Sequence, residues 1–209
     1  MLIKKMTKIA PSILSADLLD IAKEVKSVDK SGADYIHIDI MDGQYVKNIT
    51  FGPNIVRSLR KTTKKILDVH LMINSVELYV EEFIKAGANI ISFHPETVKN
   101  PKKIIELLKR NSCKAGIALH PKIKIKEIIQ YLNLVDHVIV MGVIPGFGGQ
   151  KFIKSELKKI HELNNLRKKN KLNFEIEVDG AIGDPRGLCD LAYSSRVKSI
   201  FREDLDSRP

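Results

Sequence analysis

Histidine and aspartate residues recur at the ends of short apolar segments of this chain. His37 and Asp39 lie in one segment, His70 lies in a second, and Asp179 ends a third. Residues two apart point to the same face of a β-strand, so His37 and Asp39 share a face while the isoleucines around them occupy the other. Burying imidazoles and carboxylates is costly unless a charge compensates them, as a divalent cation would. Two of each suit zinc or Fe(II), with positions left open for substrate oxygens.

These residues also have an ordinary explanation, because a single strand histidine is more often a hydrogen-bonded core residue than a metal ligand. Three separate segments with matching polar residues favour the metal site. Asp39 and Asp179 in one site then suggest a reaction. One carboxylate would remove a proton next to a carbonyl, and the other would return a proton from the opposite face. The metal would stabilise the enediolate oxygen between the two steps, and the carbon would be inverted.

A glycine-rich segment, residues 145–150, follows the apolar segment that ends at Met141. Glycines let backbone N–H groups approach an anion closely, and a helical pattern follows whose N-terminus would add its dipole. The segment therefore suits phosphate binding. An ordinary glycine turn before a helix explains it equally well from the residues alone.

The elements that must position these residues alternate along the chain. Apolar runs predict strands at residues 9–12, 35–40, 66–71, 90–93, 115–119, 137–141 and 174–178. Amphipathic stretches predict helices at residues 18–30, 54–61, 76–85, 101–110, 125–132 and 155–168. Such alternation predicts an α/β fold with a parallel sheet, either open and doubly wound or closed into a barrel. The first strand is not followed by Gly-x-Gly-x-x-Gly, which argues against a dinucleotide-binding fold.

Composition limits the remaining classes. The 209 residues are 44% hydrophobic, which fits a single domain spanning residues 1–209. We expect a cytoplasmic protein, since no apolar run could span a membrane, the lysine-interrupted N-terminus does not resemble a signal peptide, and two cysteines give no disulfide framework. The net charge is +10, but the lysines are spread along helical stretches without interleaved aromatics. We therefore expect no nucleic-acid partner, and the positive field would attract a phosphorylated substrate.

Taken together, several stretches resemble the ribulose-phosphate 3-epimerase family of the pentose phosphate pathway. They occur in the family's order between residues 8 and 180: APSILSAD at 10–17, HIDIMDG at 37–43, NITFGP at 48–53, DVHLM at 68–72, VIPGFGGQ at 143–150 followed by Phe152, and VDG at 178–180. The combination is far more specific than any one stretch. The resemblance implies a TIM (β/α)8-type barrel that interconverts D-ribulose 5-phosphate and D-xylulose 5-phosphate, a small phosphorylated sugar.

The same resemblance assigns the site. It implies that His37, Asp39, His70 and Asp179 bind one divalent metal, with zinc or Fe(II) ahead of manganese or cobalt. Asp39 and Asp179 become the proton acceptor and donor on opposite faces of C3. The substrate would contact the following residues: Ser12, His70, Met41, Met72, Met141, Gly146, Phe147, Gly148, Gly149, Gly180 and Ala181. Ser12 could otherwise be a turn residue, and the methionines could be core filling. We also expect a homo-oligomer.

The resemblance ends after Gly180. The family continues with a second glycine and later a Gly-x-Ser phosphate loop on an eighth strand, whereas here Ala181 follows and no such loop appears. Composition changes at the same point: residues 1–179 hold 26 Lys, 4 Arg and 11 Asn, and residues 180–209 hold 1 Lys, 4 Arg and no Asn. We interpret residues 181–209 as a segment from another reading frame, splice choice or gene model. A tryptic peptide spanning Val178 to Arg186 in the native protein would contradict this.

The altered tail predicts an incomplete last β/α unit. Residues 197–201 imitate the missing strand only weakly, so the sheet would keep two exposed edges and lose half of the phosphate site. We therefore expect weak substrate affinity or reduced stability. Two other functions stay open at this point: a related epimerase acting on a six-carbon ketose phosphate such as allulose 6-phosphate, and a catalytically impaired barrel.

Overall fold

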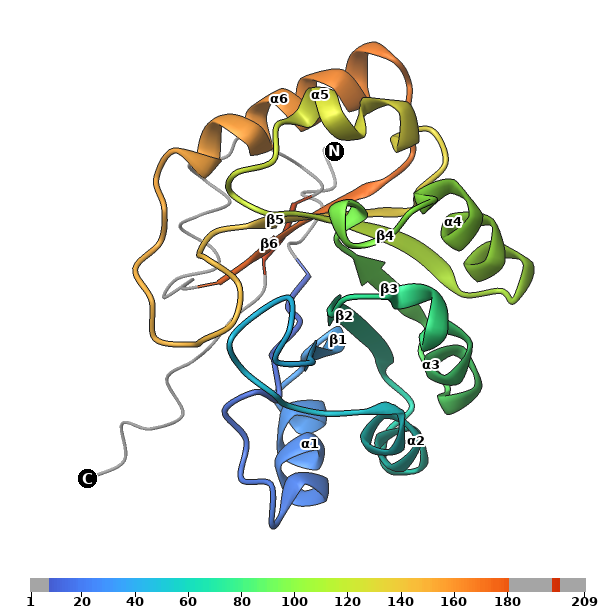
Figure 1. Ribbon diagram of the computed structural model, residues 1–209. Coiled ribbons are helices and arrows are strands. Elements are labelled where there is room, and N and C mark those ends of the chain that lie inside the picture. Colours follow the sequence, from blue (N-terminus) through green and yellow to red (C-terminus); the bar gives the residue numbers. More distant parts are fainter. Residues whose placement is uncertain (1–7, 181–196, 200–209) are drawn as a thin grey trace, which may run out of the picture.

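A curled parallel sheet forms the centre of the molecule. The computed structural model describes residues 8–180 and 197–199. Seven strands pair in sequence order, each parallel to the next: β1 Tyr35–Met41, β2 Ile66–Met72, β3 Ile90–Phe93, β4 Lys114–Leu119, β5 His137–Met141, β6 Glu175–Asp179 and β7 Val197–Ser199. The helices lie on the outer side of this sheet (Figure 1). The architecture is that of a (β/α)8-type barrel, so the predicted fold class is confirmed and the open, doubly wound alternative is not adopted.

The helices follow the predicted alternation with adjusted boundaries. They are α1 Ile21–Lys30, α2 Pro53–Thr62, α3 Val80–Ala86, α4 Pro101–Arg110, α5 Ile125–Ile128 and α6 Glu156–Lys169, with single 3-10 turns at Val76–Leu78, Pro95–Thr97 and Ile129–Tyr131. The first helix begins later than predicted because the Asp17 carboxylate accepts the N–H of Leu19 in a turn. Within the described part of the chain, no helix has the length and apolar character needed to cross a membrane.

The predicted first strand, residues 9–12, lies beside β1 without forming a full strand. Ser12 forms a parallel bridge with His37, whose N–H donates to Pro11 O at 2.9 Å. The His37 carbonyl in turn accepts the N–H of Ile13 at 3.1 Å. This segment therefore occupies the place of a strand before β1, and it brings Ser12 to the level of the metal-site residues.

The last strand corrects one prediction. Val197–Ser199 forms β7 and pairs in parallel with β6, with Ile176 opposite Val197 and Val178 opposite Ser199. The sequence suggested this strand only weakly, and the expectation that it is missing was wrong. Backbone pairing with β6 needs only a short extended segment, so a poor match to the family in side chains does not prevent it.

Strand register brings the polar residues to one level. His70 on β2 pairs with Asp39 on β1, and Asp179 on β6 pairs with Met141 on β5. The intervening residues, such as Ile36, Ile38 and Val69, are fully buried in the apolar core. The helices close that side of the sheet, and the histidines and carboxylates therefore point to the inside of the curl.

Candidate metal and catalytic centre

Four side chains from β1, β2 and β6 meet inside the sheet. His70 Nδ1 lies 3.2 Å from Asp179 Oδ2 and 3.4 Å from Asp39 Oδ1. His37 Nε2 lies 3.4 Å from Asp39 Oδ1 and 4.0 Å from Asp179 Oδ2. One ligand atom from each of the four residues lies within 4.8 Å of the other three. The structure therefore brings together the residues that the sequence predicted as a metal site.

The donor set and its burial fit a divalent ion. His37, Asp39, His70 and Asp179 are at most 4% exposed. His70 Nδ1 faces the centre of the cluster and forms no hydrogen bond with the described residues. A buried nitrogen aimed at two carboxylates is what metal coordination requires. The cluster can hold a metal ion, although its geometry does not select one element.

In the ion-free site, the charges of the four residues compensate one another. Burial lowers the pKa of His37 and His70, but the neighbouring carboxylates outweigh it, so that the pKa of His37 is well above its usual value and that of His70 rises to about 9. The two aspartates shift in opposite directions. Burial would raise the pKa of Asp39, but His37 and His70 lower it, whereas burial and Asp39 raise the pKa of Asp179.

Ser12 contacts the site through Asp39. Its hydroxyl donates to Asp39 Oδ2 at 2.6 Å and accepts the N–H of Leu14 at 3.1 Å. The hydroxyl therefore orients the free carboxylate oxygen of Asp39 while the other oxygen faces the histidines. This contact was not anticipated, since the resemblance placed Ser12 against the substrate.

Behind His37 lies a fully buried polar layer. His37 Nδ1 is 3.2 Å from Asp68 Oδ2 and 3.3 Å from Glu177 Oε1, and Glu177 also contacts His137. Asp68 lies two residues before His70 on β2, and Glu177 lies two residues before Asp179 on β6, so each shares a strand face with a candidate ligand. An imidazole whose second nitrogen faces carboxylates is a more basic metal ligand with a fixed ring orientation.

Behind His70 lies a second arm that the sequence did not reveal. His70 Nε2 is 3.0 Å from Nε2 of His94, which follows β3 directly. Glu96 and Tyr45 extend this arm, and the Tyr45 hydroxyl donates to Glu96 at 2.8 Å. Burial lowers the pKa of His94 to about 4, which keeps the ring neutral. The only sequence signal was the position of His94 directly after a strand.

A small cavity opens onto the two aspartates. Its lining residues are Leu14, Asp39, Met41, Met72, Met141, Val143, Pro145, Gly146, Asp179 and Gly180. All three methionines singled out from the sequence are buried here, but they pack in two groups. Met41 and Met72 share a cluster with Val46, whereas Met141 packs with Val143. The cavity therefore has an apolar, polarisable wall beside its carboxylates.

The glycine-rich loop, residues 145–150, borders the same cavity. Gly146 (φ 126°) and Gly149 (φ 70°) adopt backbone conformations that favour glycine. The Gly146 carbonyl accepts a hydrogen bond from Asn48, and Phe147 is exposed. Gly148 is exposed as well. Gly180 lines the cavity, and Ala181 lies outside the described residues.

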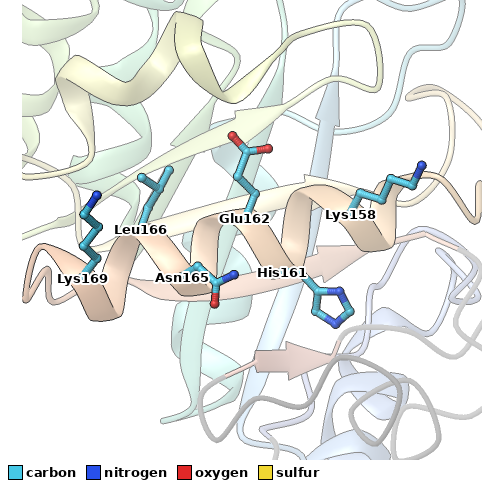
Figure 2. Close-up of a pocket in the computed structure, with 6 residues that line it drawn as sticks. All are labelled: Lys158, His161, Glu162, Asn165, Leu166 and Lys169. Carbon is cyan, nitrogen blue, oxygen red and sulfur yellow. The ribbon is translucent and has the colours of Figure 1, made fainter.

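A second, shallow hollow follows the outer face of α6. Its lining residues are Lys158, His161, Glu162, Asn165, Leu166 and Lys169. Figure 2 shows that Glu162 and Leu166 point to one side of the helix while His161 and Asn165 point to the other. The polar groups do not converge, and none of them belongs to the metal cluster. Histidines and carboxylates converge instead beside the smaller cavity inside the sheet.

Comparisons with known proteins identify the family of the chain. The model of the ribulose-phosphate 3 epimerase family matches residues 8–186, which extends past the last matching motif at Gly180. The chain is 48% identical over 178 residues to ribulose-phosphate 3-epimerase of Bacillus subtilis, covering 85% of this chain and 82% of that protein. The protein of the same name from Escherichia coli is 38% identical over 179 residues, covering 85% and 80%.

Solved structures support the fold. A tryptophan synthase α-subunit variant from Pyrococcus furiosus superposes with a TM-score of 0.69 at 12% identity, covering 94% of this chain and 88% of the other. The α-subunit from Legionella pneumophila gives a TM-score of 0.61 at 14% identity, covering 94% and 80%. At such low identity the likeness concerns the barrel architecture alone.

Proposed function

The chain belongs to the ribulose-phosphate 3-epimerase family, and we propose that it interconverts D-ribulose 5-phosphate and D-xylulose 5-phosphate by proton transfer at C3. The observation that carries the proposal is the meeting of Asp39 and Asp179 with two histidines at one level of the sheet. Two carboxylates beside one cavity are what a two-base inversion requires, because a proton must leave one face of the carbon and arrive at the other.

In the proposed mechanism, Asp39 accepts the C3 proton and Asp179 donates a proton to the opposite face. In the reverse direction their roles exchange. In the ion-free site the two groups already differ, since His37 and His70 lower the pKa of Asp39 whereas burial and Asp39 raise the pKa of Asp179. Ser12 would hold Asp39 in place through its 2.6 Å hydrogen bond.

We further propose that His37, Asp39, His70 and Asp179 hold one divalent ion, zinc or Fe(II) ahead of manganese or cobalt. Such an ion would supply positive charge for the oxygen on which negative charge develops. Met41, Met72 and Met141 would exclude water from the reacting carbons. Residues 146–149, with Gly180 and Ala181, would bind the phosphate through backbone N–H groups.

The decisive experiment measures ribulose 5-phosphate turnover before and after chelation, with Asp39→Asn as a matched variant. We expect chelation to abolish turnover and added metal to restore it. We expect Asp39→Asn to lower kcat by at least about 100-fold, as for loss of a general base. Activity that ignores both treatments would overturn the site assignment.

Substrate choice and assembly need separate measurements. Allulose 6-phosphate assayed in parallel distinguishes a five-carbon from a six-carbon preference, and we expect the five-carbon sugar to have the higher kcat/KM. We also propose a single domain that forms a homo-oligomer, a proposal that rests on the family resemblance. Light scattering on the purified protein tests it.

A further inference from the structure

We propose that His94, Glu96 and Tyr45 form a positioning chain that sets the tautomer of His70, so that Nδ1 of His70 is presented to the metal. The inference rests on the metal site of the proposed function and assigns a role to three residues outside that site. None of the three lies among the four candidate ligands. Their contribution would be to hold one ligand in its binding form once the ion has displaced the Nδ1 proton.

The two ring nitrogens of His70 face different partners. Nδ1 faces Asp39 and Asp179 at 3.4 and 3.2 Å, and Nε2 lies 3.0 Å from His94 Nε2. A nitrogen that binds a metal must offer its lone pair, so the proton of a neutral His70 has to be on Nε2. His70 therefore donates from Nε2, and His94 Nε2 has to accept.

The proton position on one nitrogen of His94 fixes the proton position on the other. A neutral imidazole that accepts at Nε2 carries its proton on Nδ1. His94 Nδ1 lies 3.5 Å from Glu96 Oε1, where a carboxylate attracts an N–H and repels a lone pair. Glu96 thus favours the tautomer of His94 that accepts from His70. One carboxylate at the far end determines both proton positions.

Tyr45 holds this carboxylate in place. Its hydroxyl donates to Glu96 Oε1 at 2.8 Å, and its ring packs on His94 with 4.8 Å between centroids. His94 is completely buried, so water does not compete for its ring nitrogens. Because rigid rings alternate with a charged group, the four side chains from Tyr45 to His70 have few other hydrogen-bonded arrangements.

The two histidine ligands are thereby supported differently. His37 has carboxylates behind it, whereas His70 has a neutral imidazole and only then a carboxylate. Supporting residues of this kind commonly change metal affinity by about 10- to 100-fold when they are replaced. We expect the chain behind His70 to act in this range.

The test measures zinc affinity of the purified protein by competition with a chelator. His94→Phe keeps a ring of similar size but removes the acceptor, and we expect its zinc affinity to fall by about 10- to 100-fold. His94→Gln restores an acceptor near the position of Nε2, and we expect it to recover most of the affinity. His120→Phe is the matched control, because His120 contacts the ring of His94 but not that of His70. We expect this variant to bind zinc like the unchanged protein.

Several outcomes overturn the inference. If the unchanged protein binds no zinc, the metal site of the proposed function fails, and this inference fails with it. If the unchanged protein binds zinc and His94→Phe binds it equally well, only the inference fails. Thermal unfolding of the metal-free variants identifies a loss of affinity caused by misfolding.

Nitrogen NMR on the unchanged zinc-bound protein provides a test without any variant. We expect the proton of His70 on Nε2 and that of His94 on Nδ1. A proton on Nε2 of His94 would refute the inference, whatever the behaviour of the variants.

Discussion

Asp39 and Asp179 show how surroundings give two identical side chains different properties. Asp39 faces both histidines and accepts the Ser12 hydroxyl, which together stabilise its ionised form. Asp179 is buried beside the charge of Asp39, which stabilises its protonated form. The difference arises from contacts between segments that are far apart in the chain, and it gives the two carboxylates complementary proton affinities.

The raised pKa of His70 leads to a prediction about metal binding. His70 has a pKa of about 9 in the ion-free site, so at neutral pH a metal must displace its proton. We expect metal affinity to fall by at least about tenfold for each pH unit below about pH 9. Chelator competition between pH 6 and pH 10 measures this. An affinity independent of pH would contradict the assigned ligands.

Protonation of His70 weakens metal binding, but it stabilises the metal-free fold. A group whose folded pKa is raised stabilises the fold fully below its unfolded pKa, about 6.5 for histidine, and the stabilisation is lost as pH rises through the folded pKa. The free energy of unfolding of the chelated protein should therefore receive a contribution from His70 that disappears between about pH 6.5 and 9. Urea unfolding at both ends of this window is the control.

At the scale of elements, the end of β6 depends on a glycine. Gly180 follows Asp179 with φ 101°, and a Cβ there would collide with Val143. Gly142 also donates its N–H to Asp179 O at 2.5 Å, so the backbone has little room to adjust. This junction places Asp179 at the cavity.

Two glycine substitutions separate backbone strain from collision. Gly180→Ala adds both, and we expect it to lower the free energy of unfolding by about 3 kcal/mol and to reduce kcat/KM. Gly32→Ala adds only strain, since Gly32 has φ 82° and open space around it, and we expect a loss of about 1 kcal/mol. Denaturant unfolding of both variants gives the comparison. Equal losses of unfolding free energy in the two variants would show that the Val143 side chain moves aside with no energetic penalty.

At the scale of the whole molecule, the sheet continues to β7 even though the family motifs end near Gly180. The family match extends to residue 186, and β7 begins at Val197. The short strand covers the edge of β6, which would otherwise be open for pairing with another chain. The Gly-x-Ser phosphate loop expected from the family is still absent from the sequence.

This absence predicts weak phosphate binding. We expect a chimera in which residues 187–209 are replaced by the corresponding end of the Bacillus subtilis relative to have a KM for ribulose 5-phosphate at least about tenfold lower. The reason is that backbone N–H groups that contact a phosphate form charge-assisted hydrogen bonds, each worth about 1.5–3 kcal/mol. Steady-state kinetics of both proteins measures the difference, and an unchanged KM would show that the present tail is sufficient.

The sequence by itself determined which residues share a strand face. Because alternation along a strand is local, residue spacing alone assigned His37 and Asp39 to one polar face. The positions of the strands along the chain and of the glycine-rich loop followed from similarly local patterns. The resemblance to a family then named the four ligands.

Only the tertiary structure decided which groups lie behind the ligands. Ser12 reaches Asp39, and His94 reaches His70, across strands whose register and curl depend on packing of the whole sheet. β7 likewise depends on pairing with β6 rather than on its own pattern. Contacts between separate segments have no period in the sequence, and for this physical reason they could not be read from it.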